Sequence, residues 1–279
     1  MKASTRAAAA LVLAGGLLAT TVAPAQAIAG GGVDATGLYA DGTRLARFDV
    51  NRPENAKKIG DLDNLVGDTK LVGIDRRVQN GRLYGVGDAG GLYVLSTSSA
   101  NARKVGQLSI ALDGTTFGVD FNPTANALRV ISNTGQNLRQ PFGTEEGPAP
   151  TTPTVVDGGL TTTTAVPVLG VTGAAYTNND LDAATATTLF DIDTTDDQVS
   201  IQSPANTGVL NPTGKLGADA GADAGFDIYS NLTKGKTVSN TGYAAINARL
   251  WTINLLTGAA SDKGKFSKAD MSDIAVDLD

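Results

Sequence analysis

The chain has 279 residues, with 22 Lys and Arg against 28 Asp and Glu, and it contains no histidine and no cysteine. These counts exclude disulfides, thiolate or imidazole metal sites, and Ser-His-Asp or Cys-His catalysis. The formal net charge of −6 argues against nucleic acid and anionic membranes as partners, because both bind clustered Lys and Arg. We expect no cofactor; if a metal is bound, its ligands must be oxygens, which favours Ca²⁺.

The first 27 residues have the pattern of a secretory signal peptide. Lys2 and Arg6 precede an apolar core from Ala7 to Ala19, and a small-residue cleavage site, "AQA", ends at Ala27. The core is too short to span a bilayer, and no second long apolar run follows it. We therefore expect cleavage after Ala27, export to the periplasm or the extracellular space, and a monomeric single domain over residues 28–279 without a transmembrane segment.

A repeat of four short strands follows the predicted signal peptide. Apolar stretches ending in a polar residue recur along the chain, namely "LVGID" (71–75), "FGVD" (117–120), "VTGAAY" (171–176) and "AGFD" (224–227). A hairpin and a further strand follow each stretch, with Gly, Asn or Asp at the turns, and helical periodicity is absent beyond residue 27. Such units are typical of the blades of a β-propeller, an all-β fold.

The two ends of the chain predict how the ring closes. The first repeat lacks its innermost strand, whereas the C-terminal "SDIAVDLD" (272–279) has no hairpin of its own. Combining them gives five blades, at residues 33–62 with 272–279, 70–109, 116–160, 169–217 and 224–266. A β-sandwich or a solenoid built from the same strands remains the alternative. Residues 144–170 are rich in Pro, Thr and Gly and predict a long excursion of the third blade.

Aspartates at the ends of four innermost strands form the first candidate site: Asp75, Asp120, Asp227 and Asp277. Innermost strands line the central channel, so these carboxylates could bind Ca²⁺ or a polyol, or supply a pair for glycoside chemistry. Alternatively, each caps the turn that follows it by accepting backbone N–H groups. Repetition favours this structural role. The acidic run "DIDTTDDQ" (191–198) is assigned to a solvated turn between third and fourth strands.

The segment "RVISNTGQNLR" (129–139) is the second candidate site. In the repeat, Arg129 aligns with Tyr39 and Tyr84, whereas Arg139 aligns with Tyr93, Phe190 and Trp251. Half-buried guanidinium groups need acidic partners. Either both arginines clamp acids of an adjacent blade, which we favour, or they form a fork for a carboxylate, sulfate or phosphate ligand. The ligand-binding candidates of this second interpretation are Arg129, Arg139, Asn133, Gln136 and Asn137.

Several of these stretches together resemble a known family. The sequences "FGVDFNPTANALRVISNTGQNLR", "TTLFDID", "GVLNPTGKLG" and "GFDI" are similar to secreted bacterial proteins grouped as domain of unknown function 4394. The similarity covers nearly all of the mature chain, and the "TGQNLR" segment is its most specific part. Membership implies an exported, propeller-like protein, but it implies no activity and no catalytic residues.

We therefore expect a non-enzymatic exported β-propeller that binds a protein, a small molecule or a carbohydrate at the cell envelope or outside the cell. The alternative is a carboxylate-dependent enzyme, resembling a glycoside hydrolase or a lactonase, with its site at the central channel. A purely structural surface protein is a third possibility. A pair of aspartates in the channel, about 5–10 Å apart and with raised pKa values, would favour the enzyme.

Overall fold

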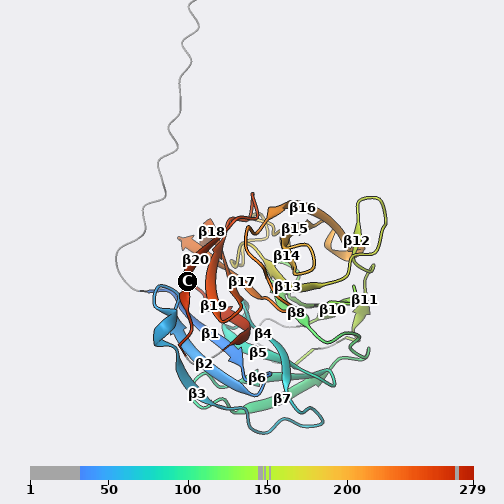
Figure 1. Ribbon diagram of the computed structural model, residues 1–279. Helices are drawn as coiled ribbons and strands as arrows, with labels where there is room; N and C mark the ends of the chain where they lie inside the picture. The colour runs from blue at the N-terminus through green and yellow to red at the C-terminus, as the bar shows by residue number, and fades with distance from the viewer. Residues whose placement is uncertain (1–31, 144–146, 148, 151, 268–269) are drawn as a thin grey trace, which may run out of the picture. The chain divides into compact units, whose positions relative to one another are not determined.

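The computed structural model describes residues 32–143, 147, 149–150, 152–267 and 270–279, so the predicted signal peptide lies outside the described residues. The strands form five blades that follow one another around a ring in chain order (Figure 1). This arrangement confirms the predicted five-bladed β-propeller. Among the described residues, no helix has both the length and the apolar character needed to cross a membrane.

Each blade is built around four antiparallel strands, numbered along the chain. Blade 1 contains β21 (Met271–Val276), β1 (Asp34–Tyr39), β2 (Arg44–Asp49) and β3 (Lys57–Asp61). Blade 2 contains β4 (Leu71–Arg77), β5 (Arg82–Gly87), β6 (Gly91–Leu95) and β7 (Ala102–Gln107). Blade 3 contains β8 (Phe117–Asn122), β9 (Ala127–Ser132), β10 (Asn137–Pro141) and β11 (Val155–Val156).

The remaining two blades complete the ring. Blade 4 contains β13 (Val171–Tyr176), β14 (Leu189–Asp193), β15 (Gln198–Gln202) and β16 (Val209–Lys215). Blade 5 contains β17 (Gly225–Thr233), β18 (Lys236–Ile246), β19 (Arg249–Ile253) and β20 (Ala260–Lys265). Two short 3-10 helices lie outside the sheets, η1 (Pro53–Asn55) and η2 (Ala205–Thr207).

The C-terminal strand closes the ring as predicted. β21 pairs antiparallel with β1, with Ala35 opposite Val276 and Gly37 opposite Ile274. The predicted excursion of blade 3 also reaches its neighbour, because β12 (Thr161–Thr162) pairs in parallel with β16 at the outer edge of blade 4. The chain between β11 and β12 thereby brings Asp157 to the interface between blades 3 and 4.

Apolar side chains fill the spaces between successive blades, but not equally. Four of the interfaces bury ten to twelve apolar residues each, whereas the interface between blades 3 and 4 buries seven among the described residues. Between blades 2 and 3, Tyr84, Phe121 and Phe142 pack edge to face, with ring centroids 5.1–5.6 Å apart. The apolar deficit between blades 3 and 4 coincides with a buried polar network.

Glycines allow the innermost strands to approach one another closely. A Cβ atom on Gly118 would lie 2.7 Å from the backbone nitrogen of Ala174, and one on Gly225 would lie 2.4 Å from the Cα of Asp273. Such distances leave no room for a side chain, because real Cβ contacts are much longer. The close approach brings the polar side chains two residues further along these strands toward one another.

Candidate functional site

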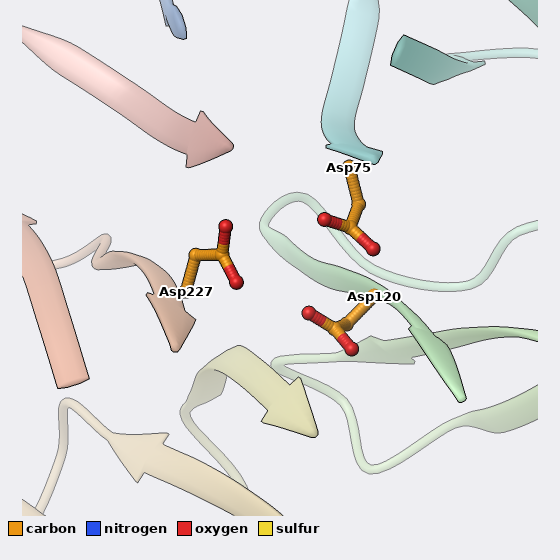
Figure 2. Close-up of side chains that lie close together, drawn as sticks. All are labelled: Asp75, Asp120 and Asp227. Carbon is orange, nitrogen blue, oxygen red and sulfur yellow. The ribbon is translucent and has the colours of Figure 1, made fainter. Parts of the chain in front are cut away.

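Three innermost strands each direct an aspartate toward the other two (Figure 2). Asp75 lies on β4, Asp120 on β8 and Asp227 on β17, and one carboxylate oxygen of each lies within 4.8 Å of the other two. The three residues are 6%, 3% and 3% exposed, respectively. The structure therefore brings together three of the four channel aspartates proposed from the sequence. We call these three residues the aspartate triad.

The prediction for Asp277 was wrong. In blade 3, the N–H of Phe121, the residue after Asp120, donates to Asp75 of the preceding blade. In β21, the N–H of Val276 donates to Asp227 in the same way, so the residue before it, Ala275, occupies the position equivalent to Asp120. Asp277 follows the end of β21, is partly exposed and forms an ion pair with Arg76. The segment "SDIAVDLD" contains several aspartates, and the one inside the strand is Asp273, two residues before the triad position.

A side chain on each innermost strand accepts a backbone N–H from the innermost strand of the next blade or, in blade 5, from the residue directly before that strand. The five acceptor and donor pairs are Asp75 and Phe121 (2.7 Å), Asp120 and Tyr176 (3.0 Å), Thr172 and Ala224 (3.2 Å), Asp227 and Val276 (2.6 Å), and Asp273 and Ile74 (2.7 Å). The recurring acids therefore do not cap the turns of their own blades, which was the structural alternative drawn from the sequence. They connect successive blades, and the connection passes around the whole ring.

Burial controls the acid–base properties of the aspartate triad. Desolvation raises the pKa of Asp75 and of Asp120 well above the ordinary carboxyl value, and the neighbouring carboxylates raise both further. Burial also raises the pKa of Asp227 to about 6, against the lowering effect of the N–H groups of Val276 and Ile228. Like charges at this spacing cannot all be ionised without compensation. The triad must therefore hold protons or a cation at neutral pH.

The two arginines of the second candidate site lie directly opposite each other, Arg129 on β9 and Arg139 on β10. Arg129 faces Asp120, so it corresponds to Tyr84, which faces Asp75, and not to Tyr39, which faces Met271. The predicted alignment of Arg139 was wrong: two of the residues aligned with it are one position away on the third strand of their blades, and the other lies on a second strand. The residues at the position of Arg139 in the other blades are Val94, Ile201 and Thr252. Tyr93 and Trp251 each precede this position by one residue. Phe190 lies on the second strand of blade 4, because a long loop precedes β14.

A protein carboxylate already occupies the space between these arginines. Asp157 accepts a hydrogen bond from Arg129 at 2.7 Å and two from Arg139 at 3.0 and 3.1 Å. Arg129, which is 2% exposed, also donates to Asn137 in its own blade and to Tyr176 and Asn206 of blade 4. The acid thus comes from the same blade, whereas the adjacent blade supplies neutral oxygens. An external anion would have to displace Asp157.

The amide side chains predicted to assist a ligand have partners within the protein. Asn133 accepts the N–H of Thr115. Gln136 donates to the carbonyl oxygen of Ala111 and accepts the N–H of Asp113. Asn137 donates to the carbonyl oxygens of Gly158 and Ala205. These residues therefore fasten surrounding loops, and they do not form one open site with the arginines.

Sequence reasoning missed a buried polar group in blade 4. Asp191 is 0% exposed on β14, where it faces Ser200 of β15, and neither oxygen of its carboxylate has a hydrogen-bond partner among the described residues. Ser200 Oγ and Gln202 Oε1 are also buried and have no hydrogen-bond partner in the described part of the chain. The turn of this acidic run connects second and third strands, not third and fourth as predicted. Alternation within "LFDID" could have signalled that Asp191 points inward with Leu189.

Two of the cavities in the described part of the chain are lined by residues of neighbouring blades. One of about 630 Å³ lies beside blades 1 and 2 and is lined by several charged residues. Among these, Arg47 pairs with Asp34, Arg52 with Asp49, and Lys58 with Asp61. A second cavity of about 520 Å³ lies between blades 4 and 5 and has no charged residue in its lining. None of the triad residues lines either cavity.

Two solved structures are similar to this chain at low sequence identity, and the description of neither one names an activity. The chain is 12% identical to the computationally designed Ika8 protein, covering 90% of this chain and 70% of the other, with a TM-score of 0.38. It is 16% identical to a structural genomics protein of unknown function from Bacteroides thetaiotaomicron VPI-5482, covering 89% of this chain and 62% of the other, with a TM-score of 0.47. No match to a curated protein was found.

The family assignment rests on the sequence itself. A single family model matches residues 44–275, which extend from β2 to β21 and so include strands of every blade. The match contains the aspartate triad, both arginines and Asp157. The chain therefore belongs to the family described as domain of unknown function DUF4394, whose members include this five-bladed β-propeller.

Proposed function

We propose that the chain is an exported, non-enzymatic binding protein whose ligand site is the uncharged cavity between blades 4 and 5. The observation that carries this proposal is the lining of that cavity, which consists only of hydroxyl, amide and apolar residues in a chain with 50 charged residues (22 + 28). The lining residues are Thr177, Asn178, Thr188, Phe190, Asn240, Thr241, Ile253, Asn254, Leu255 and Leu256.

The chemistry of this lining favours a neutral ligand that combines hydroxyl groups with an apolar face, as a saccharide does. Phe190, Ile253 and Leu255 supply apolar surface, while Thr188 and Thr241 supply hydroxyl groups. The volume of about 520 Å³ falls within the range of about 300–1,000 Å³ that is common for small-molecule sites. A charged ligand would gain no ion pair here and would lose hydration.

One strongly exposed apolar side chain belongs to the lining of the same cavity, and two more lie a few residues from lining positions in the sequence. Leu256, in its lining, is 81% exposed, and Leu181 and Val238 are 59% and 62% exposed. The latter two lie near each other, because the carboxylate of Asp180 accepts the N–H of Thr237. Apolar residues gathered around a pocket are typical of binding surfaces. They extend the proposed site beyond a single sugar unit.

The carboxylate-dependent enzyme has less support. Glycoside hydrolysis needs two carboxyl groups in contact with substrate, spaced by about 5–9.5 Å. The triad residues are at most 6% exposed, and each has an oxygen that accepts an N–H of the next blade. The raised pKa of Asp227, about 6, would suit a general acid, but a substrate has no described route to it.

Saturation-transfer NMR on the purified protein tests the binding site. Glucose, N-acetylglucosamine, maltose and cellobiose are the neutral probes, and glucuronate is the charged comparison. We expect saturation of at least one neutral sugar and a weaker response from glucuronate. Leu256→Asp should abolish the signal, whereas Leu169→Asp, which alters another exposed leucine near β12, should leave it unchanged.

Two results would contradict this proposal. One is the absence of saturation for every neutral probe, and the other is an equal response in the Leu256→Asp variant. Export is tested separately by mass spectrometry of the protein recovered outside the cytoplasm of a bacterial host. The expected mature N-terminus is Ile28, and recovery of only the full-length chain would contradict the proposed cleavage.

A further inference from the structure

The aspartate triad concentrates negative charge without a paired cation. None of the ion pairs in the described part of the chain includes Asp75, Asp120 or Asp227. The charge of Arg76 lowers the pKa of Asp227, but Arg76 is itself paired with Asp277. A buried carboxylate ordinarily requires a counter-charge or a proton. Three in one place make the deficit unusually large.

The hydrogen bonds of Asp120 leave an oxygen available. Its Oδ1 accepts the N–H of Tyr176, whereas its Oδ2 accepts no hydrogen bond from the described residues, although the residue is only 3% exposed. Asp75 similarly uses Oδ2 for the N–H of Phe121. In Figure 2 the carboxyl groups of all three residues point toward a common space. The inter-blade connections therefore account for only part of the acceptor capacity of the triad.

The spacing of these oxygens matches one kind of ion better than others. An ion equidistant from three oxygens that are 4.8 Å apart lies about 2.8 Å from each, and any shorter spacing brings it closer. Ca²⁺ takes oxygen ligands at about 2.3–2.6 Å with flexible geometry, whereas Mg²⁺ requires about 2.1 Å in a strict octahedron. Small adjustments would suffice for Ca²⁺, while Mg²⁺ would demand a larger contraction of three strands.

We propose that the aspartate triad is a Ca²⁺ site in which Asp75, Asp120 and Asp227 each supply a carboxylate oxygen and water completes the coordination. The ion neutralises carboxylates from blades 2, 3 and 5. It connects strands that are far apart in the sequence and therefore stabilises the closed ring. This site is separate from the saccharide cavity between blades 4 and 5 and does not depend on it.

Calorimetric titration tests the site with Ca²⁺ alone. The full mature protein, treated with EDTA and dialysed at neutral pH, should bind one ion per chain. Asp120→Asn retains an oxygen for the N–H of Tyr176 but removes the charge, so its Ca²⁺ affinity should fall at least tenfold. Asp75→Asn should behave in the same way, and titration with Mg²⁺ should give weaker binding than Ca²⁺ in the wild type.

Two matched variants separate the site from general acidity. Asp196→Asn alters an exposed acid in the turn between β14 and β15 and should not change the affinity. Asp273→Asn alters a buried acid outside the triad, whose oxygens accept the N–H groups of Ile74 and Ile274, and its effect should be smaller than that of Asp120→Asn.

Equilibrium dialysis of the wild type with metal analysis gives a measure that needs no variant. At about 10 mM Ca²⁺, which is well above the dissociation constants of about 0.1–1 mM of weak extracellular sites, one ion per chain should be bound. Uptake well below one ion, which would mean that protons alone neutralise the triad, overturns the proposal. Undiminished binding by both Asp120→Asn and Asp75→Asn also overturns it.

Discussion

Two buried groups of charged residues meet in blade 3, where Asp120 of one group is paired across the sheet with Arg129 of the other, and they differ in how their charge is balanced. In the aspartate triad, three carboxylates converge without an ion pair among the described residues. At the interface between blades 3 and 4, Arg129 and Arg139 are matched by Asp157 and Asp191. A balanced group can serve as a structural connection on its own, whereas an unbalanced group needs protons or a ligand.

The balanced group explains why this interface tolerates fewer apolar residues. Arg129 makes hydrogen bonds to four residues in two blades, and its positive charge lowers the pKa of Asp191 against the strong raising effect of burial. Asp191 has no direct hydrogen bond among the described residues, so its link to Arg129 acts through space or through water. The predictions below test this contrast, beginning with the largest effect.

Arg129→Met should destabilise the protein most. The substitution leaves Asp157 with only Arg139 and leaves Asp191 without its nearby positive charge. Breaking a buried charge pair by removing one partner costs about 3–5 kcal/mol. Urea denaturation should show this loss in the free energy of unfolding, while Ca²⁺ affinity stays unchanged. A loss below about 1 kcal/mol would show that the network is not a structural connection.

The stability of the calcium-free protein should decrease as pH rises, in part through Asp223. This residue faces Asp270 and Lys70, and its charge acts on Asp273; burial raises its pKa from 3.8 to about 7. The folded state therefore retains a proton that the unfolded state loses. This contribution to stability is fully present below pH 3.8 and disappears as pH rises through 7.

Asp223→Asn should reduce that pH dependence. A shift of this size corresponds to at most about 4 kcal/mol, and partial exposure reduces the expected difference to about 2 kcal/mol between pH 5 and pH 8. Melting temperatures of wild type and variant, measured in EDTA across this range, should converge at low pH and diverge at high pH. Parallel curves would mean that Asp223 titrates normally in the folded protein.

The sequence predicted the ring and all three residues of the triad for a physical reason. The innermost strands recur as apolar stretches that end in a polar residue, so the sequence alone places Asp75, Asp120 and Asp227 at equivalent positions. Asp273 and Asp277 are four residues apart and so share a strand face, and the pattern alone could not decide which lies inside the strand. The repeat could not predict the position of Asp157, because this residue lies in the excursion of blade 3, which does not follow the repeat.

Asp75→Asn should affect stability in the direction opposite to Arg129→Met. The amide still offers an oxygen to the N–H of Phe121, while one of three mutually repelling carboxylates is removed. In EDTA at about pH 8, we expect the free energy of unfolding to rise by about 1 kcal/mol. Added Ca²⁺ should reverse the order, because only the wild type retains the full site. A destabilised variant in EDTA would indicate that the triad is balanced without metal.

Arg139→Gln should have the smallest effect, which makes it the finest test of the contrast. The Arg139 side chain is 28% exposed, and Asp157 keeps its hydrogen bond from the buried Arg129 after the substitution. Partly exposed ion pairs contribute about 1 kcal/mol or less. Urea denaturation should therefore show a loss of about 1 kcal/mol, far below that of Arg129→Met. Equal losses would mean that the two arginines act as one unit, and the double variant would then be no less stable than either single one.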